Sequence, residues 1–394
     1  MPHPAFNPLV ASLSQPPVPA VLSWAQAYHG QNGPLIDLSQ AVPGYPAHPD
    51  MLRWLSEAAG STDYTGYGAI EGESVLREAY VQHVSTLYGA TIAADHIHIT
   101  SGANQAFMCA AMAIAGAGDR LAMTIPFYFN QETTLSMLGV GTVFIECDAS
   151  RSFLPDTAAV EAALVDGVKA LVLVTPNNPT GAVYPAGLLR EIFDICRRKG
   201  VWLVLDETYR DFLPEGAERP HELLSIPGWE DTLILLYSFS KSFCIPGHRL
   251  GAITAGPAVI EQVTKIMDNL QICAPRAAQA ALAKAIPTLD DWRRGNREEI
   301  MHRTDALKAV MADLPMWRME AVGAYFAFIR HPFEGVSSAF VAERLAKDAG
   351  VVCLPGVYFG PGQEPFLRFA FANADVPTIG TLRERLASFN LPSA

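Results

Sequence analysis

The chain has 394 residues, of which half are hydrophobic and 17% are charged, so it can bury one large core and a smaller one. The formal net charge is −12, which argues against a general nucleic-acid or anionic-membrane surface, because phosphate groups attract a positive field. Any phosphate would have to be held by local groups. We expect one or two globular domains.

The cysteines and the N-terminus exclude several other classes of protein. The six cysteines show no CxxC pair and no spacing typical of a metal site, and a chain of this size does not need disulfide staples. The first residues lack the basic and apolar regions of a signal peptide, and the longest uncharged apolar run, 106–118, is too short to span a bilayer. We expect a cytoplasmic protein with no metal site, no nucleic-acid partner and no membrane partner.

The first hundred residues contain little regular structure by pattern. Residues 1–34 are rich in proline, with one possible helix near 20–29, and are expected to form an arm. The loop at 41–46 reads A-V-P-G-Y-P and cannot continue a helix. Residues 63–72 are rich in glycine and tyrosine and precede a helical pattern over 74–88. The pattern alone leaves open whether Tyr67 is a turn aromatic or a functional group.

From residue 96 to residue 255, short apolar strands alternate with helices. The predicted strands are 96–100, 120–125, 142–147, 170–174, 201–205, 233–237 and 250–254, and the helical windows are 104–115, 130–138, 157–164 and 185–198. This alternation predicts an α/β fold with a mostly parallel seven-stranded sheet covered by helices. Ligands of such sheets bind at the carboxyl ends of the strands.

The last third of the chain changes character. Helical patterns continue to about residue 285, and a charged helix is predicted over 289–312. Residues 317–372 are typical of a smaller α+β unit with strands near 324–329, 351–354 and 367–371, and a final helix is predicted over 376–388.

Lys241 comes just after the predicted strand at 233–237. A lysine at a strand end is most often a solvated charge, but Ser238 lies three residues before this one and Arg249 eight residues after it. A lysine that attacks a carbonyl must be desolvated or lie beside another cation, so that its amine is often neutral. Arg249 could supply that cation and also bind a phosphate.

Other predicted strands are followed by small, aromatic or amide residues. Gly102, Ala103 and Asn104 could hold an anion at a helix N-terminus, although an ordinary helix cap is the simpler explanation of this fragment alone. Tyr128 could be a stacking platform, but such a ring is more often part of the core. Asn178 lies in T-P-N-N-P-T-G, a rigid loop that can aim an amide at a ligand.

Asp206 and Tyr209 follow the apolar strand at 201–205. A carboxylate at the mouth of a buried strand is costly unless a cation or a strong donor meets it, so we favour a functional role over a helix cap. Together the candidates supply an amine, a carboxylate, a phenol, an amide, an anion cradle and an aromatic plate. Pyridoxal 5′-phosphate requires all of these groups at once.

The same motifs resemble the class I/II aminotransferases of pyridoxal-phosphate fold type I, the aspartate aminotransferase superfamily. The resemblance rests on S-F-S-K-x7-R-x-G at 238–251, N-N-P-T-G at 177–181, D-E-x-Y at 206–209, S-G-A-N at 101–104, Y-x4-G at 67–72 and L-R-F-A-F-A at 367–372. It implies an N-terminal arm and part of the small domain over 1–48, a large cofactor-binding domain over 49–288 and a small C-terminal domain over 289–394.

The resemblance also implies roles for single residues. Lys241 would form the Schiff base and then move the substrate α-proton, and Asp206 would pair with the ring nitrogen. Tyr209 and Asn178 would bind the phenolate oxygen, and Tyr128 would stack on the ring.

The resemblance also assigns the residues that would bind the anionic groups of the cofactor and the substrate. The phosphate would be held by Gly102, Ala103, Asn104, Ser238 and Arg249. Tyr67 would reach the phosphate of a neighbouring subunit, which implies a homodimer with shared active sites. Arg368 matches the arginine that binds the substrate α-carboxylate in a bidentate fork, with Asn178 and Ala41 also at the substrate.

Two departures from the family pattern concern the substrate. Ala41 stands where family members often carry a glycine, and Arg276 does not fall on the position of a second arginine that would select aspartate or glutamate. The function expected is ping-pong transfer of an amino group from an L-amino acid to a 2-oxo acid. Elimination or oxidative deamination on the same fold, and a cofactor-binding sensor without turnover, remain alternatives.

Overall fold

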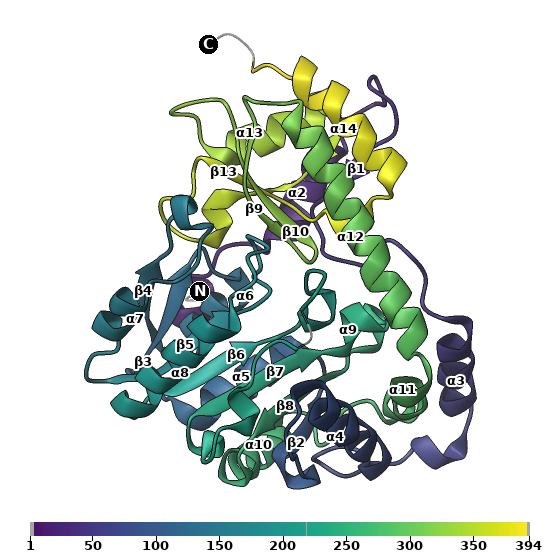
Figure 1. The fold of residues 1–394 in the computed structure, drawn as a ribbon, viewed down its shortest axis with the longest axis vertical. Helices are drawn as coiled ribbons and strands as arrows, with labels where there is room; N and C mark the ends of the chain where they lie inside the picture. The colour runs from purple at the N-terminus through teal and green to yellow at the C-terminus, as the bar shows by residue number, and fades with distance from the viewer. Residues whose placement is uncertain (1–3, 218, 392–394) are drawn as a thin grey trace.

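The chain forms two bodies joined by a long helix (Figure 1). The structure, a computed structural model, describes residues 4–217 and 219–391. The larger body contains a seven-stranded sheet with helices on both faces, and the smaller body contains a four-stranded sheet. Helix α12 (Asp290–Ala312) runs from one body to the other (Figure 1).

The seven predicted strands of the large sheet are all present, and their ends agree with the prediction within two residues. They are β2 (Ile97–Thr100), β3 (Arg120–Ile125), β4 (Gly141–Glu146), β5 (Val168–Val174), β6 (Trp202–Asp206), β7 (Leu233–Ser238) and β8 (Gly251–Ala255). Their order is β2-β8-β7-β6-β5-β3-β4. Strand β8 runs antiparallel to its neighbours β2 and β7, and the other adjacent pairs are parallel. The predicted α/β fold class, with a mostly parallel covered sheet, is confirmed.

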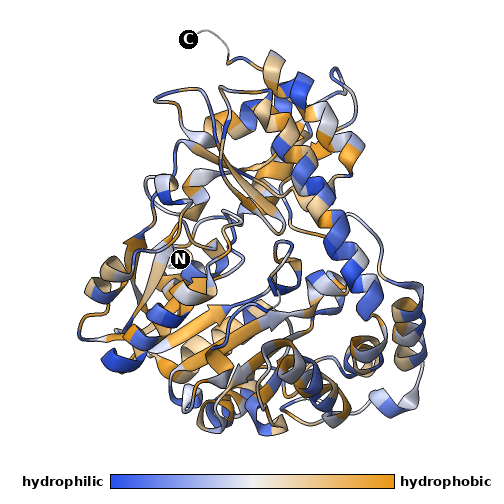
Figure 2. Cartoon of the chain, in the orientation of Figure 1, coloured by the Kyte–Doolittle hydropathy of each residue, from blue (hydrophilic) through white to orange (hydrophobic). Residues whose placement is uncertain are grey.

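Helices cover both faces of the large sheet because successive strand residues are apolar on both sides. Leu233 and Ile234 of β7, for example, belong to opposite hydrophobic cores. One core is closed by α3 (Pro49–Ala59), α4 (Ser74–Tyr88), α7 (Thr157–Ala163), α8 (Ala186–Lys199) and α11 (Arg276–Thr288). The other is closed by α5 (Ala103–Ile114), α6 (Phe129–Leu138) and α10 (Pro257–Leu270). Figure 2 shows the strands as the most continuously hydrophobic elements.

The small body is built on an antiparallel sheet in the order β12-β13-β10-β9. Its strands are β9 (Arg318–Gly323), β10 (Phe326–Arg330), β12 (Leu354–Pro355) and β13 (Phe366–Phe369), and α13 (Ser338–Arg344) and α14 (Val376–Ser388) complete it. The short strand β1 (Ile36–Asp37) pairs in parallel with β11 (Val351–Val352), so the chain N-terminal to α3 contributes to this body. We keep the domain division at residues 48 and 288 as a proposal, which this pairing and the start of α12 support.

The N-terminal arm contains α1 (Pro8–Ala11) and α2 (Pro17–Ala25), and it lies against both bodies. Proline in the first turn suits α2, because that position needs no backbone N–H donor. Val21 is buried in a core with Phe328 and Phe359 of the small body. None of the helices in the described part of the chain is long and apolar enough to cross a membrane.

Candidate active site

A cavity of about 270 Å³ lies at the carboxyl ends of β5, β6 and β7. Ten of the residues predicted for the site line it: Ala41, Ala103, Asn104, Tyr128, Asn178, Asp206, Tyr209, Ser238, Lys241 and Arg249. A larger adjoining cavity of about 800 Å³ shares several of these residues and also reaches Arg368. The placement follows from the sheet, because parallel strands bring the loops that follow them to one edge.

Lys241 lies in α9 (Phe239–Ser242), the single turn of helix that follows β7. Ser238 caps this turn with its hydroxyl, which accepts a hydrogen bond from the backbone of Ser240 at 3.3 Å. The lysine Nζ donates to the backbone oxygen of Ala41, so the loop predicted to touch substrate covers the amine. Burial, assisted by the positive charges of Arg249 and Arg368, lowers the pKa of Lys241 to about 8. About a tenth of the amine is therefore neutral at pH 7, far more than for an ordinary lysine.

Asp206 ends β6 and is 5% exposed. One carboxylate oxygen accepts hydrogen bonds from the backbone nitrogen and the hydroxyl of Thr208 at 3.0 and 2.7 Å. The other accepts one from Nε2 of Gln131 at 2.9 Å. Burial raises the pKa of Asp206 to about 6, although the Thr208 bonds oppose the rise. None of the ion pairs among the described residues includes this carboxylate, so it is poised to meet a cationic group from a ligand.

Three residues of the site were not predicted from the sequence. Gln131 of α6 and Thr208 orient Asp206, and Ser240 lines the cavity beside Lys241. Thr208 had a signal, because a threonine two residues after an aspartate often donates to it. Ser240 also had a signal, because it directly precedes Lys241 in the sequence. Gln131 had none, since its contact depends on how α6 lies over β6.

A glycine pair shapes the predicted anion cradle. Gly102 has a φ of +88°, and a Cβ there would lie 2.3 Å from Nη2 of Arg249. A Cβ on Gly251 would lie 2.6 Å from the carbonyl carbon of Gly102. A Cβ on Gly251 would push the two loops apart, and a Cβ on Gly102 would displace the Arg249 guanidinium and strain the positive φ. Arg249 therefore lies over the turn before α5, where its guanidinium donates to Ser101 O at 3.4 Å and Pro246 O at 2.9 Å.

The cradle also contains buried polar atoms that lack a partner within the described residues. These are the hydroxyls of Ser101 and Ser240. A buried polar atom without a partner is costly, so an acceptor at this place would be favourable. With the backbone at the start of α5 and the Arg249 guanidinium, the Ser240 hydroxyl borders a space suited to an anion.

Arg368 of β13 is 3% exposed and lies beside Asn178. Its Nη1 donates to the amide oxygen of Asn178 at 3.0 Å, and its Nη2 donates to the backbone oxygen of Ser39. The guanidinium also lies 4.9 Å from the ring centre of Phe326. Burial lowers the pKa of Arg368 to about 10. None of the ion pairs among the described residues includes this guanidinium, which contacts an amide and a carbonyl oxygen instead.

The rings of Tyr128 and Tyr209 complete the cavity walls. Tyr209 is 5% exposed and packs against Tyr325 and Phe326 with ring centres 5.3 and 5.1 Å apart. The Tyr128 hydroxyl accepts a hydrogen bond from the side chain of Asn130 at 2.7 Å. Burial raises the pKa of both phenols, so both are neutral at physiological pH.

Tyr67 does not reach the cavity of its own chain. Its side chain is 80% exposed and lines neither of the two cavities, so its predicted role in a neighbouring subunit stays a prediction. Arg276 holds the loop that carries it. The arginine donates to Glu73 at 2.7 Å and to the backbone oxygens of Asp63 and Gly66 at 2.9 and 3.1 Å. In this chain its guanidinium therefore ties the loop at 63–72 to Glu73.

Comparisons with known proteins agree with this geometry. The model of the class I and II aminotransferase family matches residues 33–386. The chain is 30% identical to the valine–pyruvate aminotransferase of Mycobacterium tuberculosis, with 96% of this chain and 97% of that protein covered. It is 29% identical to an aromatic aminotransferase of Arabidopsis thaliana, with 85% and 84% covered. This chain belongs to the class I and II aminotransferases.

Solved structures support the fold of this aminotransferase. A single mutant of Thermus thermophilus aspartate aminotransferase matches it with a TM-score of 0.89 and 24% identity, covering 98% of this chain and 99% of that one. A substrate-bound BacF structure from Bacillus subtilis also matches with a TM-score of 0.89, at 22% identity and with 99% of each chain covered. The family resemblance and the transaminase class predicted from the sequence are confirmed.

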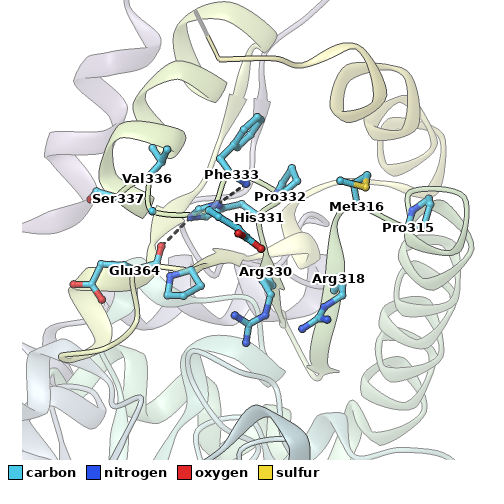
Figure 3. Close-up of a pocket in the computed structure, with 13 residues that line it drawn as sticks. Pro315, Met316, Arg318, Arg330, His331, Pro332, Phe333, Val336, Ser337 and Glu364 are labelled. Atoms are coloured by element: carbon cyan, nitrogen blue, oxygen red, sulfur yellow. Dashed lines mark hydrogen bonds between the residues drawn. The ribbon is translucent and has the colours of Figure 1, made fainter. Parts of the chain in front are cut away.

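The aminotransferase has another cavity, of about 760 Å³, in its small body (Figure 3). Arg318 and Arg330 lie at its edge, and both pair with Glu320 at 2.8 and 2.7 Å. His331 uses both ring nitrogens, which contact Glu364 O and the backbone nitrogen of Phe333 (Figure 3). Because these groups already have partners, this cavity offers no reactive set comparable to the one around Lys241.

Proposed function

We propose that this aminotransferase binds pyridoxal 5′-phosphate in the 270 Å³ cavity and transfers an amino group from an L-amino acid to a 2-oxo acid by a ping-pong mechanism. Three observations support the fit. The Asp206 carboxylate is buried without an ion-pair partner among the described residues. The Ser240 hydroxyl lines the cavity and is unsatisfied there. A Cβ on Gly102 would obstruct the cradle beside Arg249.

Each end of the cavity suits one end of this cofactor. Asp206 would pair with the protonated ring nitrogen, and Thr208 and Gln131 would hold its carboxylate in position. Ala103, Asn104, Ser238, Ser240 and Arg249 would hold the phosphate. Tyr128 would face the ring, and Tyr209 and Asn178 would bind the ring oxygen. When bound, the cofactor supplies an electron sink for the bonds of the substrate α-carbon.

Lys241 would act first as the covalent anchor and then as the proton carrier. Its lowered pKa of about 8 allows its amine to accept a proton from the substrate α-carbon and to release it again. The neighbouring cations Arg249 and Arg368 keep the pKa low. The Ala41 carbonyl accepts a hydrogen bond from the amine and so orients it.

Arg368 would bind the substrate α-carboxylate. The carboxylate would replace the Ser39 carbonyl or share the guanidinium with it, while Asn178 keeps the arginine in place. A bidentate Arg–carboxylate contact fixes the substrate as well as binding it. The α-carbon is thereby directed toward Lys241, which lines the same cavity.

The remaining expectations concern assembly and location. We infer a homodimer in which Tyr67 enters the site of the partner subunit, because its ring is exposed and lines neither cavity of its own chain. The loop is rigidly held by Arg276 and Glu73, as such a role would require. A cytoplasmic location remains part of the proposal.

The observation that carries the proposal is the lysine of lowered pKa that shares one cavity with a buried carboxylate, which has no ion-pair partner in the part of the chain that the structure describes. The test uses the chain loaded with pyridoxal 5′-phosphate. An amino acid added alone should convert the visible absorbance of the lysine-linked cofactor to that of its amine form, and an oxo acid should reverse the change. Accumulation of ammonia, peroxide or an elimination product in place of this exchange would assign one of the alternative chemistries.

The matched variants are Lys241→Ala and Lys284→Ala. Lys284 is an exposed lysine near Glu57, so its removal controls for the loss of a lysine elsewhere. Lys241→Ala should abolish the lysine-linked absorbance, and Lys284→Ala should leave it unchanged. Retention of that absorbance by Lys241→Ala would refute the site assignment.

A further inference from the structure

The 800 Å³ cavity next to Lys241 and Arg368 contains the space left for the substrate side chain. Its outer walls come from the arm at 13–19, the first turn of α6 and the segment 357–361. We infer, on the basis of the proposed function, that the amino-acid substrate has a large apolar side chain.

The charges that line this cavity disfavour an acidic side chain. The charged lining residues are Lys241, Arg368 and Glu132. In the proposed function Lys241 carries the α-proton and Arg368 binds the α-carboxylate, so the charge that remains for the side chain is the negative one of Glu132. Glu132 accepts a hydrogen bond from the Ser136 hydroxyl at 2.8 Å and enters no ion pair within the described residues. A second substrate carboxylate would meet a like charge and no cation.

Arg276 does not change this balance. It does not fall on the family position of a second arginine, and Glu73 already pairs with its Nε at 2.7 Å. Its Nη1 is bound to two backbone oxygens of the loop at 63–72. Any second copy of the chain would carry the same occupied guanidinium. A distal carboxylate therefore finds no unpaired arginine at this position in either copy.

The remaining wall is mixed: Ser14, Gln15, Asn130 and Thr133 are polar, and the other part is apolar and aromatic. Val18, Phe129 and Tyr358 are only partly buried, and they pack on the core that contains Phe359. The ring of Phe129 lies 5.2 Å from that of Tyr128 and 5.7 Å from that of Phe359. A ligand that covers these rings removes their apolar surface from water, which is favourable in proportion to the area covered.

Equilibrium binding of unreactive acids tests this inference without turnover. 3-Phenylpropanoate and succinate both carry the carboxylate that Arg368 would bind, and neither has an amino group. Calorimetric titration of the cofactor-loaded protein should give binding of 3-phenylpropanoate at least about tenfold tighter than that of succinate. Equal affinity, or tighter binding of succinate, would overturn the inference. Arg368→Met should weaken both ligands, and full retention of the 3-phenylpropanoate affinity would place that ligand at another site.

A pair of variants separates charge from packing. Glu132→Gln removes the negative charge, and Ser136→Ala removes only the hydroxyl that binds it. The preference for 3-phenylpropanoate over succinate should narrow in Glu132→Gln and persist in Ser136→Ala. The same change in both variants would contradict the charge argument.

A second measurement distinguishes this inference from the proposed function. If no amino acid converts the cofactor absorbance, the transaminase proposal fails, whatever the binding order of the acids. If aspartate converts it as readily as phenylalanine, the transaminase proposal stands and the inferred substrate class is wrong.

Discussion

Asp206→Asn should stabilise the cofactor-free chain at alkaline pH. The carboxylate is 5% exposed, and its pKa is raised by burial from 3.8 to about 6. Asparagine has the same shape, and its amide oxygen can keep the two hydrogen bonds from Thr208. The buried Oε1 of Gln131 has no partner within the described residues, so a flip of that amide would provide the acceptor that the new NH₂ group needs.

The sign and size of the effect follow from the raised pKa. Between pH 3.8 and about 6 the unfolded chain has released the Asp206 proton while the folded chain retains it. The unfolded state then binds fewer protons, so stability falls as the pH rises through this window. The rise in pKa corresponds to about 3 kcal/mol above about pH 7, and to about half of that at about pH 5.

Urea unfolding of the cofactor-free protein, followed by circular dichroism, measures this difference. The free energy of unfolding of Asp206→Asn should exceed that of the unchanged chain by up to about 3 kcal/mol at about pH 8, with a smaller excess at about pH 5. Asp211→Asn is the control of opposite sign. Burial would raise the pKa of Asp211, but Arg293 and Arg210 outweigh burial and lower it, so its loss should destabilise the chain. A less stable Asp206→Asn at the higher pH would refute the reasoning.

Three further predictions concern the substrate, the loops and the assembly. Arg368→Met should weaken binding of a carboxylate ligand by about 10² to 10³-fold, the range for one member of a buried ion pair, and Arg368→Lys should recover only part of it. Gly181→Ala should lower the free energy of unfolding by about 1–3 kcal/mol, because its φ is +77° and a Cβ there would lie 2.4 Å from a backbone nitrogen at the end of β9. Gly187→Ala, in the open first turn of α8, should not destabilise the chain. A mixture of Tyr67→Ala and Lys241→Ala subunits should regain activity that neither variant has alone, and no recovery would contradict shared sites.

The elements predicted correctly are those with a local signal. The seven apolar strands and the helix over 74–88 follow from periodicity, and the structure agrees closely. Strand β9 was not predicted. It is an edge strand with one neighbour, and only Ala321 within it is buried, so its sequence lacks the apolar alternation of a strand. Helices α3 and α13 were also missed. The seven residues of α13 are too few for a clear helical period, but α3 had a local signal, since Met51, Leu55 and Ala58 recur at helical spacing after Pro49.

The site was predictable to the extent that it follows strand ends. Lys241, Asp206 and Asn178 each stand in a loop directly after an apolar strand, and a parallel sheet brings such loops together. The contact between Gln131 and Asp206 could not be predicted, because it depends on the tertiary position of α6. The place of Tyr67 could not be predicted from a local pattern either. Only the family resemblance implied its contact with a second subunit.

Asp206, Lys241 and Arg368 share one electrostatic condition: each is an ionisable group that the fold buries. Burial shifts the pKa of Asp206 up to about 6, that of Lys241 down to about 8 and that of Arg368 down to about 10. Each shift favours the neutral form, so each charge destabilises the fold in the absence of a ligand. Apolar residues of similar volume would give a more stable fold at these positions, because replacing buried charged groups by apolar ones is often stabilising in proteins. The cationic ring nitrogen of the cofactor would pair with Asp206, its carbonyl would react with Lys241, and the substrate carboxylate would pair with Arg368. The proposed ligands would therefore offset the free energy that the fold loses by burying these three groups.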